Sequence, residues 1–105
     1  PLPDDASIAS LPRVQKHFQI DTIIDFTEVE GGMMTRMHVE SADRPGLLDI
    51  IARTLIMLDI RLHNAKVSTA GEKAVDYFDL TDKSTREPLT SELKESLKQA
   101  LLEKL

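Results

Sequence analysis

Two runs of alternating apolar and polar residues in the first half of the chain predict a β-hairpin. Residues 22–29 are rich in β-branched and aromatic side chains, and residues 35–41 alternate apolar with charged or polar positions. Gly31 and Gly32 lie between the runs and can adopt positive φ at little cost. The side chains expected to face a core are Ile24, Phe26, Met37 and Val39.

Helical spacing of apolar residues follows this hairpin. Over residues 47–58 the apolar positions recur every three or four residues, which predicts an amphipathic helix that lies flat against a sheet. Asp49 and Arg53 are four residues apart on its polar side and are expected to pair, at about 0.3–0.5 kcal/mol. The apolar stripe is formed by Leu47, Ile51, Leu55 and Leu58.

A change of phase marks the next predicted strand, residues 59–69. Ile60 and Leu62 share one phase of the alternation, whereas Ala65 and Val67 share the other. A period-two pattern can change phase only at a bulge, a break or a twist, which we expect at His63 or its neighbour Asn64. This irregularity is compatible with a plain surface feature and with a ligand site.

A second hairpin and a last helix complete the pattern. Residues 70–73 predict a turn and residues 74–82 a strand with Phe78 and Leu80 inward and with Val75 and Tyr77 on the opposite face. Leucines at intervals of four predict a helix to the chain end, capped by Thr90 or Ser91. Residues 1–19 are expected to hold a linker and a short helix over residues 11–18, leaving residues 20–105 as the domain. Because the first residue is Pro1, we expect a piece of a longer protein.

The order of these elements predicts an α+β fold. Two helices on one face of a four-stranded antiparallel sheet make a ferredoxin-like two-layer sandwich. The chain stops before the final strand of that fold, so the N-terminal strand is expected to replace it. A right-handed crossover then gives the sheet order first, second, fourth, third.

Composition narrows the function. The 105 residues include 13 basic and 18 acidic ones, a net charge of −5, with three Phe, one Tyr and no Trp. This is not the basic, aromatic surface of a nucleic-acid binder. No apolar run is long enough to span a membrane, and the lack of Cys fits the cytoplasm. We therefore expect neither nucleic acid nor membrane as a partner.

Catalytic motifs are absent from the sequence. It contains no nucleophile elbow, P-loop or zinc-protease motif, and its three His residues have no short-range ligand spacing. Asp43 could act as a base, but no nucleophile or second acid accompanies it in sequence. We expect no enzyme activity, no metal site and no cofactor in this chain.

The residues from Asp43 to Leu48 have the composition of a tight strand-to-helix turn. Pro45 ends the strand, Gly46 permits a sharp turn, and the helix that follows presents free amides. Such an electropositive helix end favours a carboxylate or phosphate. An ordinary connection between two elements would also explain this turn.

This turn, followed by an apolar helix and by residues 60–71 and 72–78, resembles an ACT domain, the small amino-acid-sensing module of metabolic regulators. Residues 13–18, the first strand and the last helix also resemble the C-terminal ACT domain of bacterial bifunctional enzymes that uridylylate and deuridylylate the PII protein. The resemblance therefore covers most of residues 13–105.

The resemblance implies a regulatory glutamine sensor that pairs with another ACT domain and controls upstream catalytic domains, which would supply any Mg²⁺ and act on PII. An ACT-type dimerisation or docking module without a ligand is the alternative. The turn would hold the ligand backbone, and a strand of a partner copy would complete the site, with Asn64 offering a donor and an acceptor. The ligand residues implied by the resemblance are Asp43, Arg44, Pro45, Gly46, Leu47, Leu48, His63, Asn64 and Ala65.

Overall fold

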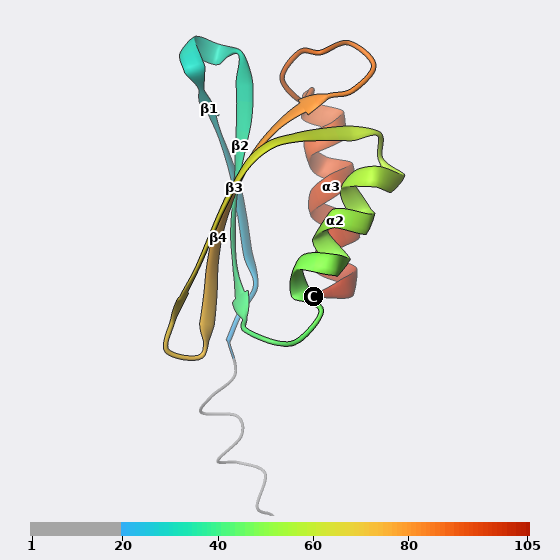
Figure 1. The fold of residues 1–105 in the computed structure, drawn as a ribbon. Coiled ribbons are helices and arrows are strands. Elements are labelled where there is room, and N and C mark those ends of the chain that lie inside the picture. The colour runs from blue at the N-terminus through green and yellow to red at the C-terminus, as the bar shows by residue number, and fades with distance from the viewer. Residues whose placement is uncertain (1–19) are drawn as a thin grey trace, which may run out of the picture.

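The computed structural model describes residues 20–105, and its elements follow the predicted order (Figure 1). Each predicted strand and each of the two long helices is present, with boundaries within one residue of those expected. The short helix and linker expected in residues 1–19 lie outside the described residues. The elements are β1 (Ile23–Val29), a 3₁₀ turn η1 (Glu30–Gly32), β2 (Met34–Ala42), α2 (Leu47–Met57), β3 (Ile60–Ala70), β4 (Lys73–Asp82) and α3 (Ser91–Lys104).

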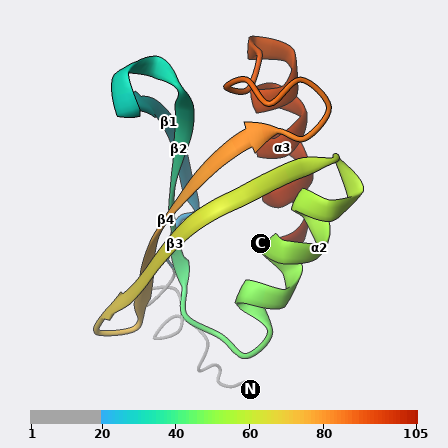
Figure 2. The ribbon, with the colours of Figure 1, turned by 45° about the horizontal axis from the view of Figure 1, so that its top comes forward.

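The four strands form one antiparallel sheet in the order β1-β2-β4-β3, as predicted. Both helices cover the same face of this sheet, which gives two layers (Figures 1 and 2). The strand β1 pairs with β2 and occupies the place of a final strand. The architecture is therefore the expected ferredoxin-like α+β sandwich, and neither helix of residues 20–105 covers the second face of the sheet.

The core lies between the helices and the sheet. Alternate residues of β2 and β4 point into it, and α2 contributes the buried side of its apolar stripe. The last helix is held by fewer residues, chiefly Leu97 and Leu101, both fully buried. Its N-terminus is capped as predicted, because the Thr90 hydroxyl accepts a hydrogen bond from the Leu93 amide at 3.1 Å. The buried hydrophobic residues are Ile24, Met37, Val39, Leu47, Ile51, Leu55, Ile60, Ala74, Phe78, Leu80, Leu89, Leu97 and Leu101.

The predicted irregularity of β3 is a register shift. Leu62 pairs with Leu80, but Asn64 pairs with the adjacent Asp79, so His63 is the extra residue. Beyond this bulge, Ala65 therefore lies on the same face as Leu62, and Asn64 lies on the other. Because of the bulge, Ala65 and Val67, which follow it in β3, lie on the helix side of the sheet.

Candidate functional site

A cavity of about 460 Å³ lies beside the N-terminus of α2, between that helix, the C-terminal end of β3 and the N-terminal end of β4. Its volume is within the range of small-molecule sites. It is formed entirely within one chain. Its lining residues are Asp43, Arg44, Gly46, Leu47, Leu48, Asp49, Val67, Ser68, Thr69, Ala74 and Asp76.

Two hydrogen bonds attach the turn between β2 and α2 to neighbouring elements. The Asp43 amide donates to the Glu72 carbonyl at 2.9 Å, which ties the turn to the β3–β4 hairpin. The Arg44 guanidinium donates through Nη2 to the Lys104 carbonyl at 2.7 Å, which ties it to the end of α3. Between these attachments the chain reverses at Gly46, whose φ of 82° lies in the left-handed region that glycine favours.

The first residues of α2 line this cavity, and no side chain caps the N-terminus of the helix. Leu47 donates weakly to the Arg44 carbonyl at 3.3 Å, and Ile50 makes the first regular helical bond, to the Gly46 carbonyl. Within residues 20–105 no acceptor is provided for the amides of Leu48 and Asp49. Free amides at the positive end of a helix are suited to binding a carboxylate.

Asp76 is a buried acidic residue in the lining of the same cavity. It lies on the helix-facing side of β4, paired with Val39 on one neighbouring strand and Val67 on the other, and is only 2% exposed. Its Oδ1 accepts a hydrogen bond from the Ser68 amide at 3.3 Å. Burial raises the pKa of Asp76 above its ordinary value, and the nearby charge of Asp43 raises it further. The folded state therefore favours a positive partner or a proton at this position.

The charges around the cavity are mainly negative. Among residues 20–105, Asp43, Asp49 and Asp76 line it together with a single cation, Arg44. Asp49 also forms the predicted exposed ion pair with Arg53, at 2.8 Å. The cavity thus combines amide donors at one side with carboxylates at the other, an arrangement complementary to a small zwitterion.

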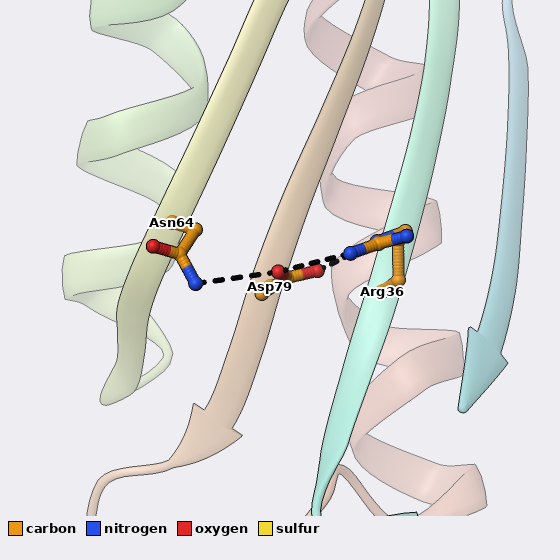
Figure 3. A network of polar contacts seen from close by, with 3 residues as sticks. All are labelled: Arg36, Asn64 and Asp79. Carbon is orange, nitrogen blue, oxygen red and sulfur yellow. Dashed lines mark hydrogen bonds and ion pairs between the residues drawn. The ribbon is translucent and has the colours of Figure 1, made fainter. Parts of the chain in front are cut away.

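A second cavity, of about 700 Å³, lies on the face of the sheet opposite α2 and α3. Three charged or polar side chains from β2, β4 and β3 form a row there (Figure 3). Arg36 donates to both carboxylate oxygens of Asp79, at 2.8 and 3.2 Å, and Asn64 donates to Asp79 Oδ2 at 3.4 Å. The lining residues are Glu30, Arg36, Asn64, Ala65, Lys66, Tyr77 and Asp79. Tyr77 also stacks on His38, with ring centroids 4.7 Å apart.

The hydrogen bond from Arg36 holds the pKa of Asp79 below its ordinary value, despite the opposing effect of burial. A lowered pKa in the folded state means that ionised Asp79 stabilises the fold above the ordinary pKa of an aspartate, and that this stability is lost as pH falls through the lowered value. We expect Asp79→Asn to lower the free energy of unfolding at pH 7 and the difference from the unchanged chain to shrink towards pH 3. Urea unfolding at both pH values measures this. The same substitution at the exposed Asp25 is the control, and an equal loss at both pH values would contradict the expectation.

The predicted ligand residues are divided between the two cavities. Five of the six turn residues line the first cavity; Pro45 does not. Asn64 and Ala65 line the second cavity, and His63 lines neither; its Nε2 is 2.7 Å from the Thr81 hydroxyl. One chain therefore does not bring the two groups together. Their contribution from a partner copy stays a prediction.

Sequence reasoning missed Asp76 and the end of β3. Within one chain the turn faces Val67, Ser68 and Thr69 rather than the bulge, because the crossover places the start of β3 at the far end of the sheet. The signal for Asp76 was present: it is in phase with the inward Phe78 of the same strand, so an acid occupies a core position.

Residues 20–105 contain no group of three or more His, Asp or Glu side chains that could hold a metal ion. Neither helix there combines the length and the apolar character needed to cross a membrane.

The two-layer fold, with a cavity at its first strand-to-helix turn, defines a ferredoxin-like module of the kind that ACT domains form. Comparison with known proteins shows which proteins contain such a segment. The chain is 39% identical over 92 residues to the bifunctional uridylyltransferase/uridylyl-removing enzyme of Xanthomonas euvesicatoria pv. vesicatoria (strain 85-10), a match that covers 88% of this chain and 10% of the relative. It is also 39% identical over 94 residues to the enzyme of that name from Vibrio parahaemolyticus serotype O3:K6 (strain RIMD 2210633), covering 90% of the chain and 11% of the relative.

These matches confirm the resemblance to the bifunctional uridylyltransferase/uridylyl-removing enzymes, and they are consistent with an ACT domain. The chain spans about a tenth of the length of these relatives. No family model matches the chain.

Proposed function

We propose that this chain is a regulatory ACT domain that binds a free amino acid, glutamine by its resemblance, and thereby controls the uridylyltransferase and uridylyl-removing activities of a parent enzyme acting on PII in the cytoplasm. The observation that carries the proposal is the cavity at the uncapped N-terminus of α2, lined by the turn residues and by Asp76. The similarity to one segment of the bifunctional enzymes supports the choice of parent. The chemistry, with any Mg²⁺, belongs to other parts of that parent.

A second ACT domain is the proposed structural partner. The outer edge of β3 has no neighbouring strand among the described residues, and all but the first residue of this strand are exposed. A partner copy or tandem domain could bring Asn64 close to the ligand held by the turn. The ligand would then shift the parent between its two activities by binding its alternative states unequally, with a typical coupling of about 1–3 kcal/mol.

Calorimetry with L-glutamine tests the sensor directly. We expect saturable heat with one glutamine bound per chain, because the amides of α2 accommodate a carboxylate and the acidic wall an ammonium group. D-Glutamine is the control for stereospecific contacts. The absence of heat, together with a tight dimer in sedimentation, would instead support the docking module without a ligand. Assays of nucleotidyl transfer by the isolated chain should give no product, and any product would contradict the assignment of chemistry to the rest of the parent.

A further inference from the structure

A buried carboxylate, that of Asp76, lies in the lining of the first cavity, in addition to the amides of α2. It interrupts a row of apolar residues on the helix side of the sheet, between Val39 and Val67, and is 98% removed from solvent. A carboxylate in such a place is unfavourable unless its oxygens have donors. The Ser68 amide supplies one donor, to Oδ1, and within residues 20–105 none is supplied to Oδ2. The side chain therefore retains acceptor capacity beside the cavity.

The other charges of the cavity limit which ligands could donate to the Asp76 carboxylate. Two further carboxylates, Asp43 and Asp49, line the same space, and Arg44, the one cation that residues 20–105 contribute to it, already donates to the Lys104 carbonyl. A ligand that carries only a negative charge would be opposed by three carboxylates. A ligand with a carboxylate and an adjacent ammonium group would be complementary to the helix amides and to the acidic wall together.

On the basis of the proposed function, we infer that Asp76 binds the α-ammonium group of the amino-acid ligand, while the amides at the start of α2 bind its α-carboxylate. Both charged ends of the zwitterion are then bound within a single chain, by groups that β4 and α2 bring to one cavity. Asp76 would be the residue that distinguishes an amino acid from the 2-oxo acid or des-amino acid of the same carbon skeleton. A partner strand is not needed for this step.

The test combines a change in the protein with a change in the ligand. L-Glutamine and its des-amino analogue, 4-carbamoylbutanoate, are titrated into the 105-residue chain and into Asp76→Asn. We expect glutamine to bind the unchanged chain at least tenfold more tightly than the analogue, and this preference to disappear in Asp76→Asn, because Asn keeps the bond from Ser68 but has no charge for the ammonium group. The common protein amino acids are titrated in the same way.

Controls separate loss of binding from loss of fold. Asp82→Asn makes the same change in charge on the same strand, outside the cavity, and should leave glutamine affinity unchanged. Thermal unfolding of Asp76→Asn should show a Tm equal to or above that of the unchanged chain, because the substitution removes a buried charge.

The two proposals fail in different ways. If glutamine does not bind but another amino acid does, the choice of glutamine is wrong, and the comparison is made with that amino acid and its des-amino analogue. If an amino acid binds but Asp76→Asn weakens it and its analogue equally, or weakens neither, the role of Asp76 is wrong. If no amino acid binds the unchanged chain, both the sensor and the role of Asp76 are overturned.

Discussion

Replacing Leu97 by Ala is expected to lower the free energy of unfolding by about 2–5 kcal/mol. Leu97 is fully buried on α3, a helix that has only one other fully buried residue, Leu101. The substitution removes apolar contacts and leaves a space that the sheet below cannot readily fill. Since a small domain has a total stability of only about 5–15 kcal/mol, this single change would remove a large part of it.

Leu102 provides the matched control. It is on the same helix, only five residues further along, and 39% exposed. Leu102→Ala makes the same change in helix propensity. Its expected cost is below about 1 kcal/mol, because the Leu102 side chain is partly exposed and its truncation removes less buried apolar area. Urea unfolding of both variants gives the comparison. Equal losses would mean that α3 does not pack on the core as described.

Replacing Gly46 by Val is expected to abolish detectable glutamine binding while costing the fold roughly 1–3 kcal/mol. The φ of 82° strains any residue with a Cβ, and a β-branched one most. A Cβ built at this position meets no atom within 4 Å, so the substitution causes no clash at the Cβ, and because Gly46 lines the cavity, we expect the added side chain to obstruct a ligand's approach to the backbone. Calorimetry measures the binding, and urea unfolding measures the strain.

Gly31→Val is the control for this variant. Gly31 has a similar φ of 66° and equally open surroundings, but it lies in the turn between β1 and β2, at the opposite end of the sheet (Figure 1). It should show a comparable loss of stability with unchanged glutamine affinity. If Gly46→Val still binds glutamine, the ligand site does not lie at the turn between β2 and α2.

Most of the fold could be predicted because each element has a clear pattern of its own. The period-two alternation of β2 and β4 and the apolar stripe of α2 give their positions and inward faces directly. The order of the strands followed from the handedness of one crossover and the length of one hairpin. Even the bulge in β3 could be placed, since the change of phase between Leu62 and Ala65 has few other physical explanations.

The candidate site could be predicted only in part. The turn residues were evident from their types, but their neighbours across the cavity depend on how far β3 runs past the helix, which no local pattern contains. The residues Asn64 and Ala65 came from a resemblance, and within one chain they line a different cavity. Asp76 is harder to predict, because Phe78 and Leu80 are enough to define the inward phase of β4 and an acid is not expected at a core position.

The extra residue in β3 has a consequence for how this strand can change. If the bulge were absent and His63 itself paired with Asp79, the ladder with β4 would be unbroken, but every later residue of β3 would exchange sides. Lys66 and Ser68 would then turn towards the cavity, and Val67 would turn away from it to the outer side. The bulge therefore separates a small, uncharged wall from one that carries an ammonium group of its own, and the register of a single residue decides what the cavity can admit.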